Sequence, residues 1–278
     1  MALDVTYIPG LDPILYSLSL HAKGIDVVLV CPNDSIELKC QLERALDRFA
    51  IEGSVRVARP YPSLPVKRHV STAAYLRWQL PQLLSDYGRI LYLDVDAVPF
   101  ANIEDLIFID LKNHPVGCVQ DPINPTIGSP LAMGSGHQPR NIAIAPYYNS
   151  GVLVIDPDLW RLEGVTERCL DLAMNPTVKM NFVDQDPFNL TIAGRALSIP
   201  LKYNTYPVEF YSLIARYDGR KVLRRSKWCV AERSAHILHF AGPLKPWMND
   251  YPDTWASTRY RDVQDTAAHL SASSLVNQ

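Results

Sequence analysis

The segment RILYLDVDAVPF, residues 89–100, ends an apolar run with two aspartates, Asp94 and Asp96, one residue apart. A charge at the end of a buried strand is costly unless it is paired or bound to a metal. Residues i and i+2 of an extended strand point to the same side, so both carboxylates face one site. Two hard oxygen ligands at this spacing suit Mg²⁺ or Mn²⁺ carrying a diphosphate. The alternative is a surface turn with two solvated acids.

Polar side chains also flank two other apolar runs. In YYNSGVLVID, residues 147–156, Asn149 and Ser150 directly precede a predicted strand. A glycine follows them, at a position where a side chain would obstruct the close approach of a neighbouring group. The predicted strand VGCVQD ends in Asp121. These residues are candidates for a ligand site at the strand ends, and Asp121 is equally compatible with an ordinary acid at the end of a strand.

An acidic and amide cluster precedes a predicted helix in FVDQDPFN, residues 182–189. Asp184, Gln185 and Asp186 stand before Pro187, and proline is favoured at the first position of a helix. Taken alone, Asp184 and Gln185 would serve as a helix cap. The same side chains could also line a polar ligand site.

A histidine and a lysine lie close together in HILHFAGPLKPW, residues 236–247. His239 ends a predicted strand, Gly242 begins a Gly-Pro turn, and Lys245 follows that turn. Arg77 lies on a predicted helix shortly before the aspartate strand. Neutral imidazole is a common metal ligand, and lysine and arginine pair with phosphates.

Strand-like and helix-like segments alternate along the chain, which predicts βαβ units and an α/β fold around a central, mostly parallel sheet flanked by helices. Ligands bind beyond the carboxyl ends of the strands in such sheets. The predicted early strands are 3–8, 26–31 and 54–58. The predicted early helices are 12–24, 35–50 and 70–88. Apolar positions recur at helical spacing in the first, Ser35 is the expected N-cap of the second, and the third is expected to kink at Pro81.

The composition excludes several classes of protein. The chain has 278 residues, 47% of them hydrophobic, and a formal net charge of -2. This balance is typical of a globular domain and shows no electrostatic footprint for nucleic acid. The five cysteines contain no CxxC pair, and neither a signal peptide nor an apolar transmembrane run is visible. A cytoplasmic protein without a transmembrane segment is therefore expected, with a peripheral position at a membrane as the alternative.

The motifs LYLDVD, YYNSGVLVID, DQDPFN and HFAGPLKPW, in this order and approximate spacing between residues 70 and 250, resemble glycosyltransferase family 8. This is the family of glycogenin and the bacterial lipooligosaccharide galactosyltransferases. The resemblance implies a single Rossmann-like GT-A domain over residues 1–250, followed by a peripheral tail at 251–278. It also implies a retaining, Mn²⁺-dependent transferase that moves a hexose from a UDP-sugar to a hydroxyl acceptor. Galactose and glucose are the leading sugars, with N-acetylglucosamine as a third.

By matched motif position, the resemblance implies that Asp94, Asp96 and His239 hold Mn²⁺, with Mg²⁺ as an alternative. Lys245 would pair with the diphosphate. The other residues expected to contact the UDP-sugar are Ile8, Pro9, Gly10, Asp12, Arg77, Val95, Asp121, Asn149, Ser150 and Gly242. The first four replace the acidic or Asn residues and the Tyr with which the family usually holds the nucleobase.

Two reaction routes fit these residues. In a double displacement, Asp184 or Asp186 would be the nucleophile. In a front-face route no enzyme nucleophile is needed and Gln185 steadies the reacting centre, and this route is preferred. The Gly- and Pro-rich stretch 122–146 is a candidate donor lid or acceptor wall.

Two other functions fit the same layout. A non-catalytic nucleotide-sugar binding protein would keep the metal residues without turnover. A nucleotidyltransferase would normally carry a Gly-rich basic loop after the first strand, and YIPGLDP is not one. The acceptor is open between a glycan, a glycolipid and a protein, and the sequence is silent on the oligomeric state.

Overall fold

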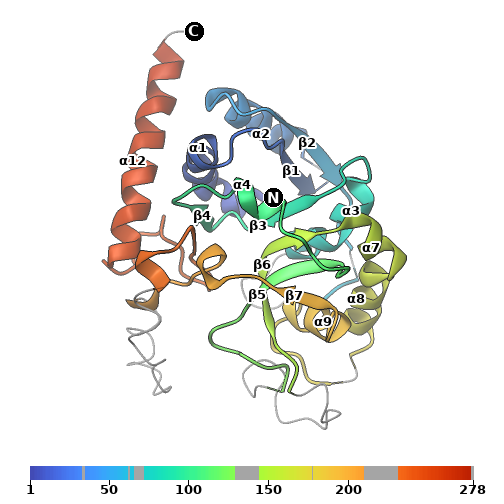
Figure 1. The fold of residues 1–278 in the computed structure, drawn as a ribbon. Coiled ribbons are helices and arrows are strands. Elements are labelled where there is room, and N and C mark those ends of the chain that lie inside the picture. Colours follow the sequence, from blue (N-terminus) through green and yellow to red (C-terminus); the bar gives the residue numbers. More distant parts are fainter. Residues whose placement is uncertain are drawn as a thin grey trace.

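The computed structural model describes residues 1–32, 35–61, 63–65, 72–128, 144–176, 178–209 and 231–276 (Figure 1). The strands are β1 Val27–Pro32, β2 Gly53–Ala58, β3 Ile90–Leu93, β4 Ala97–Pro99, β5 Val116–Gln120, β6 Tyr148–Ile155, β7 Ala196–Ser198 and β8 Ile237–His239. The α-helices are α1 Leu11–His21, α2 Ile36–Arg48, α3 Leu80–Leu83, α4 Glu104–Ile107, α7 Pro157–Leu162, α8 Val165–Met174, α9 Gln185–Thr191 and α12 Trp255–Val276. Three 3₁₀ helices are η1 Val5–Gly10, η2 Thr72–Gln79 and η3 Leu201–Tyr203.

The central sheet has four strands in the order β3-β6-β5-β7. β6 runs antiparallel to both of its neighbours, and only β5 and β7 are parallel. The predicted α/β fold with a central sheet flanked by helices is confirmed (Figure 1). Among the described strands, however, this sheet is mixed rather than mostly parallel, because β6 enters the sheet at the end where β5 leaves it. All eight residues of β6 are buried, as expected for a central strand covered on both faces.

Two strand pairs lie beside the central sheet. β1 and β2 are parallel and are joined through α2, which makes the βαβ unit predicted for the first part of the chain. Ser35 begins α2 by accepting a hydrogen bond from the backbone N–H of Leu38. β4 and β8 are antiparallel, so a segment near residue 98 pairs with one near residue 238.

Two predicted elements differ in the structure. The strand expected at 3–8 is replaced by η1, which begins after Asp4 accepts a hydrogen bond from the N–H of Thr6. The single helix expected at 70–88 is divided into η2 and α3. Pro81 lies in the first turn of α3, where its missing N–H needs no partner, and it therefore marks a helix start rather than a kink.

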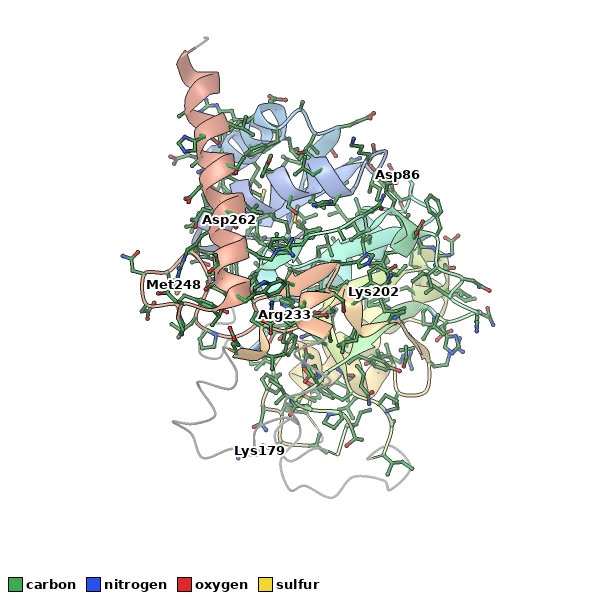
Figure 2. The ribbon with its side chains drawn as sticks, turned by 60° about the vertical axis from the view of Figure 1, so that its left-hand side comes forward. Asp86, Lys179, Lys202, Arg233, Met248 and Asp262 are labelled. Atoms are coloured by element: carbon green, nitrogen blue, oxygen red, sulfur yellow. The ribbon has the colours of Figure 1, made fainter. Side chains whose placement is uncertain are left out.

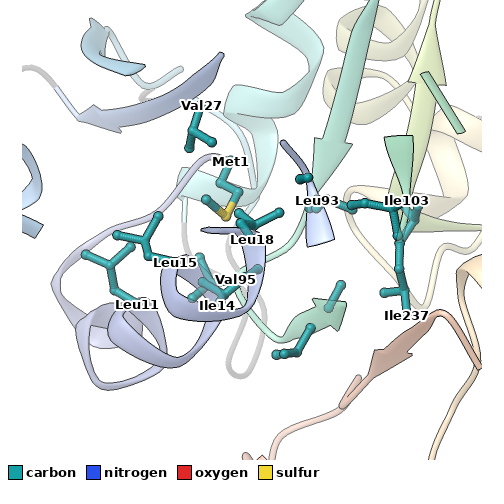
Figure 3. Packing of buried hydrophobic residues seen from close by; sticks show 14 of the residues in the cluster. Met1, Leu11, Ile14, Leu15, Leu18, Val27, Leu93, Val95, Ile103 and Ile237 are labelled. Atoms are coloured by element: carbon teal, nitrogen blue, oxygen red, sulfur yellow. The ribbon is translucent and has the colours of Figure 1, made fainter. Parts of the chain in front are cut away.

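The hydrophobic core continues on both sides of the sheet. On one side, α1 buries Leu11, Ile14, Leu15 and Leu18, whose spacing is that of one helical face (Figure 3). The opposite core contains large aromatic side chains from three elements, namely Trp78, Trp160 and Phe188.

The residues expected as a peripheral C-terminal tail contain a long helix. α12 packs against α1 and lies along one side of the protein (Figure 1). Its buried residues Ala256, Tyr260 and Ala267 join the same hydrophobic core as α1. None of the helices in the described part of the chain is long and apolar enough to span a bilayer.

Candidate active site

Strand pairing brings together the two aspartates and the predicted histidine. Leu93 pairs with Val152 in the β3–β6 register, so Asp94 follows directly beside Gly151 and donates its N–H to the Gly151 carbonyl at 2.8 Å. On the other side, β8 pairs with β4 such that His239 lies opposite Ala97. These two antiparallel registers place side chains far apart in the sequence at one end of the sheet.

Asp94, Asp96 and His239 form a cluster with the dimensions of a metal site. One ligand atom from each residue lies within 4.8 Å of the others. His239 Nε2 is 3.4 Å from Asp96 Oδ1 and 3.9 Å from Asp94 Oδ2. Asp96 and His239 are buried and Asp94 is partly exposed, so the cluster is open on the side of Asp94.

Gly151 leaves the space that this cluster needs. A Cβ at this position would lie 2.2 Å from His239 Cε1 and 2.8 Å from Asp94 Oδ2. Both contacts are closer than side chains tolerate, so only glycine allows the imidazole and the carboxylate to occupy these places. The close approach expected at the glycine of YYNSGVLVID is thus present, and the donor set fits a divalent cation.

Lys245 adds a cation to the cluster. Its Nζ donates to Asp96 Oδ2 and lies 3.4 Å from the carbonyl of Phe240. Burial opposes the ionisation of Asp96, but Lys245 and His239 outweigh it and hold the pKa of that carboxyl below its usual range. Gly242, with φ of 106°, provides the left-handed turn that leads the chain from His239 back to Lys245.

The loop around Lys245 packs against the N-terminal part of the chain. Met248 lies in this loop, near the beginning of α12 (Figure 2). Trp247 contacts Gly10 so closely that a Cβ there would lie 2.5 Å from its ring, and it meets Tyr7 edge to face. Lys245 Nζ is 5.7 Å from the centre of the Tyr7 ring. The η1 segment that includes Ile8 and Pro9 therefore borders the site.

Arg77 links the metal cluster to α9. Its Nη2 is 3.2 Å from Asp94 Oδ1 and 3.5 Å from Asp184 Oδ2, while its Nη1 donates to the Ser150 carbonyl at 2.7 Å and hydroxyl at 2.8 Å. The guanidinium also lies over the Tyr92 ring at 5.0 Å. Burial raises the pKa of Asp184, and the neighbouring Arg77 opposes that rise. A buried arginine with this many partners has a fixed position.

Gln185 is the centre of a second polar group. Its Oε1 accepts hydrogen bonds from Asn149 Nδ2 at 3.0 Å and from the Ser150 N–H at 3.0 Å. Its Nε2 donates to the hydroxyl of Tyr147 at 3.3 Å. Because the backbone N–H of Ser150 can only donate, the atom of Gln185 that faces it must be the oxygen, and this fixes the orientation of the Gln185 amide.

Asp121 and Asp186 have all of their oxygens engaged with protein groups. Asp121 accepts from the N–H groups of Ile123 and Asn124, and from the hydroxyl of Tyr206 at 3.0 Å. Burial raises its pKa above the usual range.

Asp186 is fully buried and accepts from the hydroxyl of Tyr147 at 2.5 Å and from the N–H groups of Asn181 and Phe182. Burial raises the pKa of Asp186 to about 7 in spite of these donors. Its carboxylate therefore holds the loop that precedes α9.

Two of the predicted residues have other surroundings. The carboxylate of Asp12 pairs with Arg48 at 2.5 Å and accepts from Ser271 Oγ at 3.1 Å, so it joins α1 to α2 and α12 instead of reaching the cluster. Val95 is buried in the hydrophobic core between the two aspartates. Of the stretch 122–146, residues 129–143 lie outside the described part, and the proposed lid falls on them.

Several residues near the cluster were not predicted from the sequence. Tyr7 borders Lys245, Tyr92 donates to Asp94 Oδ1 at 2.5 Å, and Tyr206 packs edge to face on His239 at 5.6 Å. Asn204 contacts His239 Nδ1 at 2.8 Å. Tyr7 lies in the segment YIPGLDP and Tyr92 in the motif LYLDVD, so their places in the sequence could have indicated them. Nothing in the segment KYNTYP around Asn204 indicates a role in the site.

The structure combines a sheet that has helices on both sides with an Asp-Asp-His cluster at one end of that sheet. The chain matches the sequence model of Glycosyl transferase family 8 over residues 1–250. The protein therefore belongs to that family, and it is a glycosyltransferase by family.

Its relatives include two enzymes of lipopolysaccharide synthesis. It is 30% identical over 185 residues to lipopolysaccharide 1,2-glucosyltransferase of Escherichia coli (strain K12), covering 66% of this chain and 52% of that protein. It is 26% identical over 196 residues to lipopolysaccharide 1,3-galactosyltransferase of Salmonella typhimurium, with the same coverage of 66% and 52%. The matched region thus spans about half the length of these relatives.

The fold is similar to that of a solved galactosyltransferase. The structure of LgtC in complex with donor and acceptor sugar analogs matches with a TM-score of 0.73 and 21% identity. The match covers 95% of this chain and 94% of that one. At this identity the likeness identifies the fold, which is GT-A, and assigns no substrate.

Proposed function

We propose that this protein transfers a hexose from a UDP-sugar to a hydroxyl acceptor, in a Mn²⁺-dependent reaction that retains the anomeric configuration. The observation that carries the proposal is the convergence of Asp94, Asp96 and His239 with the ammonium group of Lys245. Two carboxylates and an imidazole suit Mn²⁺, with Mg²⁺ as the alternative ion. When bound, such an ion would neutralise the charge of a leaving diphosphate.

Lys245 and Arg77 would assist at the diphosphate. The Lys245 ammonium, now paired with Asp96, is close enough to the cluster to pair with a phosphate oxygen instead. Arg77 holds Asp94 and Asp184 in place and remains charged at any relevant pH. The backbone of Ile8, Pro9 and Gly10 would contact the uracil, since η1 borders the Lys245 loop.

The sugar would lie between the metal cluster and the group around Gln185, with Asn149, Ser150 and Asp121 beside it. In the transfer step, the bond between the anomeric carbon and the phosphate oxygen breaks and its electron pair leaves with UDP. The acceptor oxygen forms the new bond to that carbon, and its proton passes to the phosphate oxygen of the leaving UDP.

A front-face route is the version of this step that we favour. In a double displacement, Asp184 or Asp186 would first attack the anomeric carbon. Asp186 is fully buried with hydrogen bonds to both oxygens, and Asp184 pairs with Arg77. Asp186 thus has no free oxygen for a nucleophilic attack, and the ion pair with Arg77 holds the Asp184 carboxylate on the side of the arginine. Both observations support the route in which Gln185 only steadies the centre.

Glucose and galactose are the sugars proposed first, because the relatives named above are a glucosyl- and a galactosyltransferase. N-acetylglucosamine remains a third candidate. The acceptor would be the hydroxyl of a glycan, a glycolipid or a protein. A cytoplasmic site of action belongs to the same proposal and rests on free cysteines, of which Cys31, Cys118 and Cys169 are buried.

The test is a calorimetric titration of UDP into the protein with Mn²⁺ and, separately, with EDTA. We expect tight binding with Mn²⁺ alone, and loss of that binding in Asp94→Asn and in Asp96→Asn. Asp86→Asn is the matched control, since Asp86 is an exposed acid (labelled in Figure 2) that precedes β3, whereas Asp94 follows the other end of that strand. Equal UDP binding in EDTA, or in both site variants, would contradict the metal-dependent site. Binding of UDP-sugars without transfer or hydrolysis would identify a non-catalytic nucleotide-sugar binding protein.

A further inference from the structure

Asn204 lies between the sugar-side polar group and the metal cluster. It directly follows η3 and is 1% exposed. Its Nδ2 donates to Asn149 Oδ1 at 2.8 Å, and its Oδ1 lies 2.8 Å from His239 Nδ1. The residue therefore touches one member of each group without being a member of either motif.

A backbone amide fixes the direction of every hydrogen bond in this chain of contacts. The N–H of Gly151 can only donate, and it donates to Asn149 Oδ1 at 2.9 Å. Asn149 Oδ1 is thus the acceptor, so the Asn204 atom that faces it is the amide nitrogen. The other end of Asn204 is then its oxygen, and His239 Nδ1 must carry the proton that this oxygen accepts.

The consequence falls on the other ring nitrogen. A neutral imidazole with its proton on Nδ1 has a lone pair on Nε2. His239 Nε2 is the atom that faces Asp96 Oδ1 at 3.4 Å and Asp94 Oδ2 at 3.9 Å. Without the Asn204 oxygen, the proton would be drawn to Nε2, where the carboxylate of Asp96 could accept a hydrogen bond from it. Nε2 would then offer no lone pair to a cation.

We propose that Asn204 is a positioning residue that holds His239 as the Nδ1–H tautomer and so prepares Nε2 for a divalent metal ion. The inference rests on the proposed function, because the metal site is part of that proposal. It also couples the two halves of the site, since the same side chain orients Asn149, which donates to Gln185. Partners of this kind orient metal-bound histidines in many proteins.

The first measurement is the tautomer itself, in metal-free protein without nucleotide. ¹⁵N NMR of labelled imidazoles distinguishes the two neutral tautomers at a pH at which the ring is neutral. His239 is assigned among the seven histidines by the signal missing from His239→Gln. We expect the Nδ1–H form in the wild-type protein and the Nε2–H form in Asn204→Leu. Asn204→Asp keeps an acceptor for Nδ1 and is expected to retain the wild-type tautomer.

The second measurement is Mn²⁺ affinity without UDP. We expect Asn204→Leu to lower it roughly 10- to 100-fold, and Asn204→Asp to remain within a few-fold of the wild type. Thr205→Val is the matched control, because it removes a hydrogen bond of the same segment, from Thr205 Oγ1 to the Leu201 carbonyl at 2.8 Å, and leaves the Asn204 side chain unchanged.

Three results would overturn the inference. They are a wild-type His239 protonated on Nε2, an Asn204→Leu variant with unchanged tautomer and Mn²⁺ affinity, and an equal loss of affinity in Thr205→Val. The first needs no variant, so misfolding of Asn204→Leu does not protect the inference. A wild-type protein that bound no Mn²⁺ would contradict the proposed function. Equal Mn²⁺ binding by the wild type and Asn204→Leu would instead contradict only the role of Asn204, so the two failures can be told apart.

Discussion

The replacement Gly151→Ala tests the geometry of the metal cluster with a single methyl group. That methyl would lie 2.2 Å from His239 Cε1 and 2.9 Å from His239 Nε2, whereas ordinary contacts begin at 3.4 Å. The imidazole must therefore retreat by about 1.2 Å, several times the roughly 0.2 Å within which metal–ligand distances vary. Asp94 Oδ2, 2.8 Å from the methyl, must move as well.

The expected result is a folded protein that has lost its metal site. Displacing a ligand should cost at least as much as disturbing its support, so we expect Mn²⁺ affinity to fall by about 100-fold or more. Overpacking of the strand should lower the free energy of unfolding by about 1–3 kcal/mol. Mn²⁺ titration followed by electron paramagnetic resonance measures the first quantity, and urea denaturation measures the second.

Gly88→Ala is the control for this replacement. Gly88 precedes β3, and a Cβ there would meet nothing within 4 Å, so both measurements should match the wild type. If folded Gly151→Ala bound Mn²⁺ within about threefold of the wild type, the imidazole and Asp94 could not both be ligands in the positions described. The reasoning from the Gly151 contact to the metal site would then be refuted.

Two further predictions concern buried charges. Lys245→Met removes the ammonium group that pairs with Asp96. At an effective dielectric of about 20, the attraction within such a pair is worth up to about 4 kcal/mol, and the cost of removing both charges from water offsets much of it. We expect this variant to bind Mn²⁺ alone roughly 10-fold more tightly than the wild type, and to bind UDP in the presence of Mn²⁺ more weakly. Calorimetry that finds both affinities reduced would contradict the idea that Lys245 leaves Asp96 to pair with the diphosphate. Burial raises the pKa of Asp186 to about 7, so between the unfolded value near 4 and pH 7 the folded protein binds more protons and its stability falls as the pH rises. Asp186→Asn should flatten this part of the stability curve in urea unfolding at pH 4.5–8, and an unchanged slope would show that Asp186 ionises normally.

Local patterns predicted the elements that obey local rules. The apolar positions of α1, the serine cap of α2 and the alternation around β1 and β2 all follow from neighbours in the sequence. The strand predicted at 3–8 was wrong, and the helix predicted at 70–88 was right only in part, because the same apolar runs fit more than one backbone. Asp4 starts a 3₁₀ helix in the first, and Pro81 starts a new helix in the second.

The candidate site was predicted where a motif placed polar groups beside a strand. Asp94, Asp96 and His239 do converge, as does Lys245. The sequence could not place Asp12, whose carboxylate is drawn to Arg48 and Ser271 of two other helices. The partner of the Asp12 carboxylate depends on which cation lies near it in the folded protein.

What the sequence by itself determined is that two carboxylates follow a buried strand. The strand period expected to point both of them to one side does not apply, because β3 ends at Leu93. A turn follows, in which the Ala97 N–H donates to the Asp94 carbonyl at 3.0 Å, and this turn brings Asp96 to the same site as Asp94. What only the tertiary structure decided is the partner of each group. The β3–β6 and β4–β8 registers bring Gly151 and His239 to the aspartates, and a relay through Asn204 sets the proton of His239. Hydrogen bonds between residues 35 or 55 positions apart depend on distances that covalent spacing does not fix.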